Sequence, residues 1–365
     1  MPNAAKNTGG IWQTFLLVVF RIEMMDNDQI AEQQKINLAL DAGLMDGMSA
    51  IKAEQGEVLL FDVQTNSLVG GAGLKDSGEG HYFIQEPLMR SAPPVILPAA
   101  IYLTIMQANG NPDDVILEDS NTTLEYAFAH GIDDAIRQSL ERYIPESKGC
   151  YLQSVIMLRM GLLALEPDDE RPKIGKTEAE NYQELKDMLF LPDNMMRWMN
   201  AVARGEDLDD NYEKVHHIFN AENVKKLRDM LRLSVTDGLA SGTNSDVVPI
   251  SGITYVSLQD KKRRRRISFC GYFPSDNPTY GIYVELIRKE QLEDPVMDEW
   301  PKLGKGAAIV CKTVAEMFVK QGQKHLQTID HEPMEVVEGD QEGDSIVPVV
   351  KEVTVKSVDG IGITF

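Results

Sequence analysis

The twenty residues SFCGYFPSDNPTYGIYVELI (268–287) contain two β-branched and aromatic runs separated by Pro274–Pro278. Such runs favour strands, and Pro, Ser, Asp and Asn favour a turn between them. The preceding run SGITYVSL (251–258) has the same character and is joined to them by a basic segment. Residues 247–290 are therefore predicted to form neighbouring antiparallel strands.

A second hairpin is predicted closer to the start of the chain. The segment EVLLFDVQTNSLVGGAGL (57–74) places turn-forming residues, Gln64–Ser67, between two apolar runs. Before this hairpin, Ile36, Leu38 and Leu40 occupy alternate positions, so we expect a strand there that continues into an amphipathic helix.

Three further segments have the pattern of helices. A nearly all-apolar stretch within residues 86–110 follows a proline-containing lead-in and ends at Asn109-Gly110. Residues 220–239 place apolar side chains on one face, and residues 306–320 are also expected to be helical. The order of hairpin, helices, hairpin and helix predicts an α+β fold, an antiparallel sheet covered by helices.

The composition excludes several classes of function. The chain has 365 residues and a formal charge of −21, so nucleic acid is not a predicted partner. Three cysteines without a CxxC pattern and six histidines without HExxH indicate no structural zinc site, no metal and no cofactor. A hydrophobic content of 43% is enough for a sizeable core.

We expect one main domain with short flanking segments. The predicted boundaries are an N-terminal segment (1–34), the domain (35–331), and an acidic linker with a short tail (332–365). The apolar run Trp12–Phe20 is shorter than a membrane span and has no basic leader or cleavage site. It is expected to be a core strand or short helix, with the remnant of an anchor as the alternative, and no transmembrane segment is predicted.

These segments together resemble the transpeptidase domain of class B penicillin-binding proteins, most closely those of Bacteroidetes. The first quoted stretch is similar to the strands and turn after that family's KTG motif, and residues 304–318 (GKGAAIVCKTVAEMF) are similar to its C-terminal helix. Residues 57–74 resemble the opening hairpin, and EPLMRSAPPVILPAAIYL (86–103) resembles the catalytic helix. The resemblance implies a penicillin-binding-protein transpeptidase or β-lactamase-like fold.

The chemistry of that family requires three motifs at one cleft. A serine and a lysine three residues later (SxxK) share a helical face, so that the amine can take the serine proton. An SxN motif adds a hydroxyl and an amide, and a KTG motif on the edge strand binds the substrate carboxylate.

In this alignment, the SxxK motif has lost both its nucleophile and its base. With Glu86-Pro87 matched to the Glu-Pro of the family, the nucleophile position falls on Met89 and the lysine position on Ala92. Neither side chain carries an ionisable proton or a base. Ser91 lies two positions late and is interpreted as a helix cap, but it remains the fallback nucleophile.

The other two motifs are lost in the same way. The SxN position falls on Ala127-Phe128-Ala129, and the KTG position falls on Ile250, Ser251 and Gly252. Alanines replace the hydroxyl and the amide of SxN, whereas the KTG position keeps a hydroxyl and the glycine but has an apolar Ile250 in place of the lysine. We therefore expect Met89, Ala92, Ala127, Ala129 and Ile250 to converge on a groove filled by packing.

Two other patterns need an interpretation. Ser49-Ala50-Ile51-Lys52 is a literal SxxK, but the family has no catalytic group before the opening hairpin, so we interpret it as a chance match. The run Lys261–Arg266 is expected to be a solvated loop between strands. Alternatively, Arg263, Arg264, Arg265 and Arg266 contact an acidic partner, anionic lipid or glycan phosphate.

The resemblance and the three losses predict a catalytically inactive domain with a binding or scaffolding role in peptidoglycan synthesis or cell division. Its expected partners are cell-wall or division proteins or a peptidoglycan precursor, and no oligomeric state is predicted. The alternative is an active acyl-serine transpeptidase or carboxypeptidase with a rearranged site. Resemblance implies the periplasm or the membrane surface, whereas the absence of a recognised signal leaves the cytoplasm open.

Overall fold

The computed structural model describes residues 27–76, 82–85, 92–144, 164–165, 177–186, 188–205, 221–259, 264–289 and 300–329. The chain divides into two compact units, residues 1–323 and 324–365. The side chains discussed below belong to the first unit. The apolar run Trp12–Phe20 and the acidic tail lie outside the described residues.

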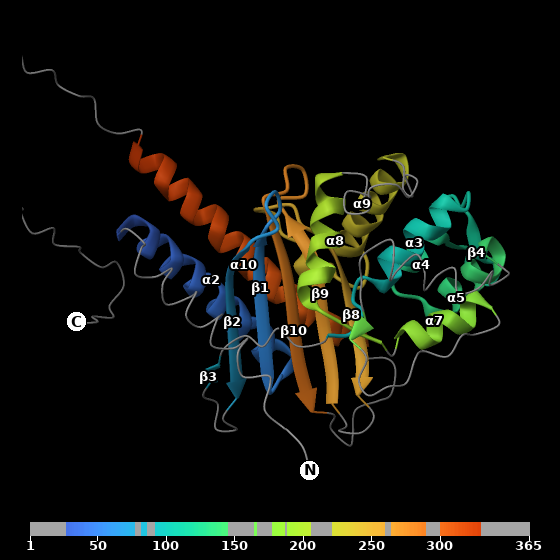
Figure 1. Ribbon diagram of the computed structural model, residues 1–365, viewed down its shortest axis with the longest axis horizontal. Helices are drawn as coiled ribbons and strands as arrows, with labels where there is room; N and C mark the ends of the chain where they lie inside the picture. The colour runs from blue at the N-terminus through green and yellow to red at the C-terminus, as the bar shows by residue number, and fades with distance from the viewer. Residues whose placement is uncertain are drawn as a thin grey trace, which may run out of the picture. The chain divides into compact units, whose positions relative to one another are not determined.

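A six-stranded antiparallel sheet runs through the first unit in the order β3-β2-β1-β10-β9-β8 (Figure 1). Its strands are β1 (Gln55–Asp62), β2 (Leu68–Asp76), β3 (Tyr82–Gln85), β8 (Ser251–Gln259), β9 (Arg264–Phe273) and β10 (Tyr280–Lys289). Both predicted hairpins are present, β1 with β2 and β9 with β10. Because β1 also pairs with β10, the two hairpins form one continuous sheet.

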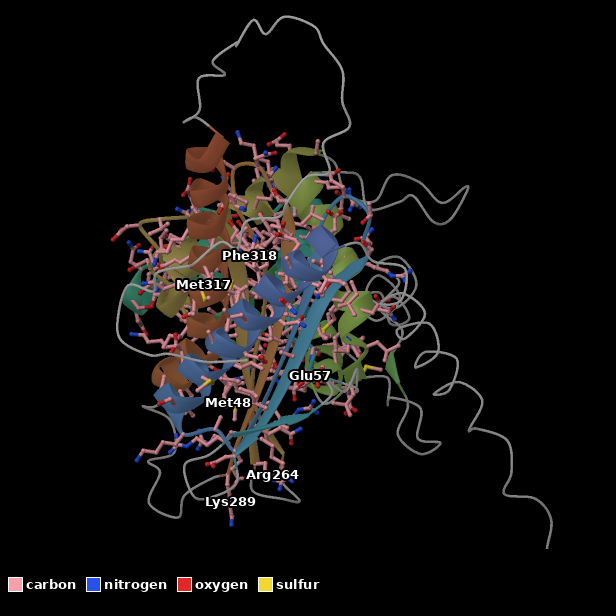
Figure 2. The ribbon with its side chains drawn as sticks, turned by 90° about the vertical axis from the view of Figure 1, so that its left-hand side faces the viewer. Met48, Glu57, Arg264, Lys289, Met317 and Phe318 are labelled. Atoms are coloured by element: carbon pink, nitrogen blue, oxygen red, sulfur yellow. The ribbon has the colours of Figure 1, made fainter. Side chains whose placement is uncertain are left out.

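Helices cover both faces of this sheet. On one face, α2 (Asn27–Ile51) and α10 (Trp300–Ile329) lie side by side (Figures 1 and 2). On the other face, α8 packs on β9 and β10, α9 packs on β8, and the remaining helices form a lobe next to β8. These helices are α3 (Leu97–Gln107), α4 (Leu124–Ala129), α5 (Asp133–Tyr143), α7 (Glu178–Lys186), α8 (Pro192–Arg204) and α9 (Ala221–Thr236). The predicted α+β fold is confirmed.

Short elements complete the lobe. Two-stranded pairs are formed by β4 (Val115–Leu117) with β5 (Thr122–Thr123), and by β6 (Ala164–Leu165) with β7 (Leu189–Phe190). Single 3-10 turns occur at Glu118–Ser120 and Ser241–Thr243.

Alternate residues of the central strands divide the buried side chains into two cores. Leu59 and Tyr283 point into the lobe core, which they share with α3, α4, α8 and α9. Val58 and Val284 point into the helix-pair core, which they share with α2 and α10. Because neighbouring residues of a strand face opposite sides, these two cores lie on opposite faces of the sheet.

The predicted strand at Ile36, Leu38 and Leu40 is wrong, because all three residues lie inside α2. Ile36 and Leu40 are buried four residues apart on one helical face, whereas Leu38 is 62% exposed. The helix also carries Gly47, where a Cβ would lie 2.3 Å from Val310 Cγ2 of α10. The absence of a side chain there allows the two helices to approach each other closely.

Candidate functional site

The segment that leads into α3 starts in a backbone bridge at Ala92 and continues as a turn before the helix begins. The Ala92 N–H donates to Phe190 O at 2.7 Å, and the Phe190 N–H donates to Ala92 O at 2.9 Å. The helix begins five residues later at Leu97, after the N-cap residue Ile96, which makes no side-chain cap. The position that the alignment gives to the lysine is therefore fixed in a backbone bridge and does not lie on a helical face.

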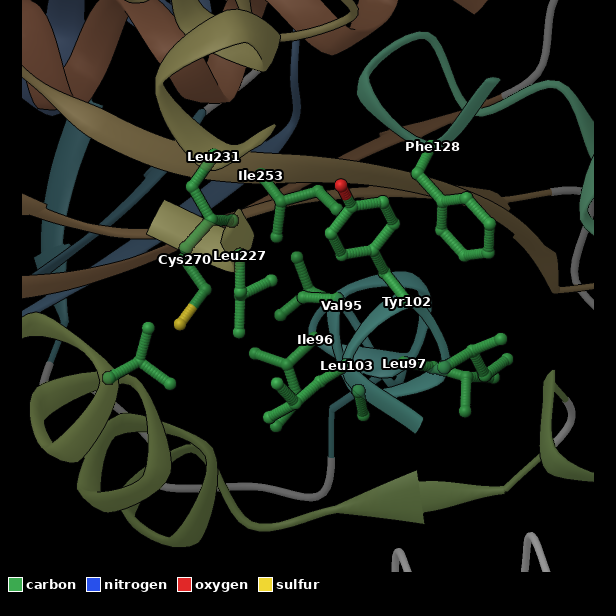
Figure 3. Packing of buried hydrophobic residues seen from close by; sticks show 14 of the residues in the cluster. Val95, Ile96, Leu97, Tyr102, Leu103, Phe128, Leu227, Leu231, Ile253 and Cys270 are labelled. Carbon is green, nitrogen blue, oxygen red and sulfur yellow. The ribbon is translucent and has the colours of Figure 1, made fainter. Parts of the chain in front are cut away.

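Met89 and Ser91 lie outside the described residues. The interpretation of Ser91 as the helix cap is wrong, because Ile96 occupies the N-cap position. From residue 92 to residue 101 the sequence APPVILPAAI contains no hydroxyl and no ionisable side chain. In Figure 3, Val95 and Ile96 pack beside Leu227 and Ile253 in the lobe core. The beginning of α3 is thus surrounded by hydrocarbon.

The SxN position lies on α4, which starts after a capped turn. Thr123 Oγ1 accepts a hydrogen bond from Tyr126 N at 3.3 Å and satisfies one free donor of the helix start. Ala127 and Ala129 are 0% and 1% exposed and belong to the lobe core. At the two positions that the sequence alignment assigns to the hydroxyl and the amide, this chain packs two methyl groups.

The KTG position lies at the start of β8. Ile250 is 1% exposed and belongs to the helix-pair core. The Ser251 hydroxyl donates to Ser275 Oγ at 3.1 Å, next to the turn between β9 and β10. At Gly252 a Cβ would lie 2.4 Å from Phe269 Cζ, so a glycine is needed for the close packing of β8 on β9.

The structure brings together only part of the expected set. Ala92, Ala127 and Ala129 are all in the lobe core. Ile250 is in the core on the opposite face of the sheet, so it does not join them. Within the described residues, the expected groove is therefore filled by α3, α4 and β8 side chains, with Ile253 rather than Ile250 as the contribution of the edge strand.

Two arginines near the start of β8 were not identified in the sequence. Arg232 Nη1 donates to Ile250 O at 2.7 Å and to Ser275 Oγ at 3.2 Å. Arg228 Nη2 donates to Ser275 O at 3.3 Å. Burial raises the pKa of the neighbouring Tyr272, although hydrogen bonds with Arg228 and Ser251 act in the opposite direction. The spacing of four residues on α9 is the signal that could have identified this pair.

Comparisons with known proteins find relatives only among solved structures: no protein-family model and no curated protein matches the chain. The transpeptidase domain of the FtsI4 D,D-transpeptidase from Legionella pneumophila superposes with a TM-score of 0.59 at 14% identity, over 78% of this chain and 96% of that chain. Penicillin-binding protein 3 from Mycobacterium tuberculosis superposes with a TM-score of 0.58 at 13% identity, over 79% of this chain and 78% of that chain. A peptidoglycan glycosyltransferase from Burkholderia ambifaria superposes with a TM-score of 0.55 at 14% identity, over 80% of this chain and 96% of that chain.

This chain has the fold of a penicillin-binding-protein transpeptidase domain. Identities this low show the fold alone, and the roles of individual residues must be argued from the geometry of this chain.

The literal SxxK lies in a different part of this transpeptidase fold. Ser49 is near the end of α2, and Lys52 follows the last helical residue with a φ of 54°. Both side chains are exposed, and α2 lies on the face of the sheet opposite the lobe core. This SxxK therefore does not lie beside α4 or the start of β8.

The basic run occupies a strand, so the predicted loop is wrong for its last three residues. Arg264, Arg265 and Arg266 begin β9, and Arg263 lies outside the described residues. Arg265 is 4% exposed. Arg266 pairs with Glu285 of β10, and this carboxylate keeps the arginine pKa raised despite burial. Contact of the run with an acidic partner, anionic lipid or glycan phosphate stays a prediction.

In the part of the chain that the structure describes, no three or more His, Cys, Asp or Glu side chains are grouped so that they could hold a metal ion. Among the described helices, none is both long and apolar enough to cross a membrane.

Proposed function

We propose that this chain is a catalytically inactive penicillin-binding-protein-like domain with a binding or scaffolding role in peptidoglycan synthesis or cell division. The observation that carries the proposal is the lead-in to α3. The sequence from Ala92 to Ile101 has no nucleophile and no base, and it is fixed by the bridge to Phe190 and by close packing.

Acyl transfer to a serine requires a hydroxyl and a base within hydrogen-bond reach. In the family, one helical turn supplies both groups. Here the first turn of α3 holds only hydrocarbon, and Ala127 and Ala129 extend this hydrocarbon surface on α4. The same packing excludes water and a polar substrate from the start of α3.

The scaffold around the former cleft supports the second half of the proposal. Buried side chains form a connected core on each face of the sheet, and six strands form one sheet between the two cores. The similar structures are named as a D,D-transpeptidase, a penicillin-binding protein and a peptidoglycan glycosyltransferase. A domain that keeps this fold but has lost acyl transfer can still bind other molecules through its surface. We therefore propose cell-wall or division proteins, or a peptidoglycan precursor, as its partners.

Covalent labelling tests the proposal. The purified full chain is incubated with fluorescent penicillin and analysed by gel fluorescence and intact mass, beside an active transpeptidase domain. We expect no adduct on this chain, with cooperative thermal unfolding of the same sample as the control for folding. A stoichiometric adduct that disappears in Ser91→Ala or Ser49→Ala would refute the proposal and identify the nucleophile.

A further inference from the structure

The helix α2 carries apolar side chains on two opposite faces. Ile36, Leu40 and Leu44 belong to the helix-pair core, which places their face of α2 against the sheet. On the opposite face, Leu38 is 62% exposed and Met45 is 49% exposed. In Figure 2, α2 and α10 lie on the side of the sheet that faces the viewer. The exposed apolar face of α2 therefore points away from the sheet.

The residues of this exposed face follow the helical repeat. Spacings of seven, four and three residues place one set of side chains on the same side of the helix: Ala31, Leu38, Ala42 and Met45. We call these four residues the outer face of α2. The outer face extends over about 21 Å at 1.5 Å per residue, and none of its residues is charged. A helix face in contact with water normally carries charged side chains, so this one has the composition of a covered face.

Exposed apolar residues are concentrated on this helix. Among the described residues, seven large apolar side chains are exposed, and three of them, Ile30, Leu38 and Met45, belong to α2. The other four come from β2, β4, α4 and the loop before β8. Single exposed apolar residues are common in soluble proteins, whereas a row of them along one helix indicates a contact surface.

A segment of the same chain, outside the described residues, has the composition and the position to cover the outer face. In the apolar run at residues 12–20 (WQTFLLVVF), seven of the nine side chains are apolar and none is charged. Only six residues, 21–26, separate this run from Asn27, the first residue of α2. Seven extended residue steps span about 23 Å, whereas Leu38 lies about 17 Å along α2 from Asn27. The connection is therefore long enough for the run to reach the outer face, and short enough to give it a high effective concentration there.

We propose that the apolar run at residues 12–20 packs on the outer face of α2 of the same molecule. The contact removes Leu38, Met45 and the side chains of the run from water, and this burial is the main favourable contribution to such a contact. The run is then part of this domain and neither inserts into a membrane nor binds a second copy. The proposal is independent of the proposed loss of acyl transfer, because α2 lies on the face of the sheet opposite the lobe core.

Hydrogen exchange of the full chain, measured by mass spectrometry, tests the contact. Leu38→Ser/Met45→Ser changes the outer face, and Val115→Ser/Val247→Ser changes two exposed apolar residues on other elements as the matched control. We expect the amides of residues 12–20 to exchange about tenfold faster in the first variant than in the native chain, and at the native rate in the control. Equal exchange of these amides in the native chain and in the first variant would overturn the proposal.

Thermal unfolding gives a second readout, which compares changes on the two sides of the contact. Leu38→Ser/Met45→Ser and Leu16→Ser/Val18→Ser should each lower the Tm by about 3–8 °C, because each pair removes one side of the same buried surface. The four substitutions together should lower the Tm by little more than one pair alone. Additive shifts, or no shift for either pair, contradict the proposal.

Two further outcomes would identify a different occupant of the outer face. A dimer that is detected by light scattering and dissociates in Leu38→Ser/Met45→Ser would assign this face to a second copy of the chain. Slow exchange of residues 12–20 only in the presence of phospholipid vesicles would assign the run to a membrane. Either result overturns the proposal.

Discussion

Arg266→Ala should lower the free energy of unfolding more than any other single substitution in the basic run. The Arg266 and Glu285 side chains are 12% and 10% exposed and pair with each other, and the Tyr283 hydroxyl donates to Glu285 at 2.7 Å. Removal of the arginine leaves Glu285 buried and directly opposite Glu57 in the register of β1 and β10. Breaking a buried pair from one side costs about 3–5 kcal/mol, so the Tm should fall by roughly 6–20 °C for a domain of this size.

Urea and thermal unfolding, followed by tryptophan fluorescence, measure this cost. Arg264→Ala is the matched control, because Arg264 lies at the more exposed end of β9 and should change the stability by less than about 0.5 kcal/mol. Arg266→Met/Glu285→Leu removes both charges and should be more stable than Arg266→Ala. If Arg266→Ala and Arg264→Ala have the same free energy of unfolding, the ion pair between Arg266 and Glu285 does not stabilise the sheet.

Three further changes test other parts of the structure by the same unfolding measurements. Gly47→Ala places a Cβ against Val310 of α10 and should cost about 1–3 kcal/mol, whereas alanine at an open helical site would stabilise. Tyr102→Phe removes a buried hydroxyl without a partner and should raise the stability by roughly 1 kcal/mol; a loss would show an undetected hydrogen bond. Burial opposes ionisation of Asp133, but Lys186 outweighs it and keeps the Asp133 pKa below its usual 3.8. Its stabilisation is present above that value and lost as the pH falls through the lowered pKa, so Asp133→Asn should flatten the stability profile below about pH 4.

The strands and the long helices could be predicted because their signals are local. The hairpin turns contain Pro, Asn, Asp and Ser, and α3 is apolar along its whole length. The false strand at Ile36–Leu40 shows the limit of such reasoning. Over five residues, apolar positions two apart fit a strand and also fit a helix with one exposed leucine, and only the burial of Leu44 and Met48 further along shows the helical period.

The candidate site was less predictable because its decisive contacts are distant in sequence. A run of arginines has the composition of a solvated loop, but its last three residues pair with β8 and β10, and Arg266 forms an ion pair with Glu285. The alignment at Glu86-Pro87 also assumed that the helix follows directly, whereas α3 begins at Leu97.

The bridge between Ala92 and Phe190 limits how this chain could be engineered. Both main-chain hydrogen-bonding groups of Ala92 are used by β7, and Pro93 and Pro94 follow before the helix starts. A lysine introduced at position 92 would therefore stand in a backbone bridge and not on a helical turn. Acyl transfer to a serine could be introduced into this scaffold only by replacing the whole segment that leads into α3 and the start of the helix. The main-chain bridge at Ala92, rather than the identity of the side chains, prevents a catalytic turn there.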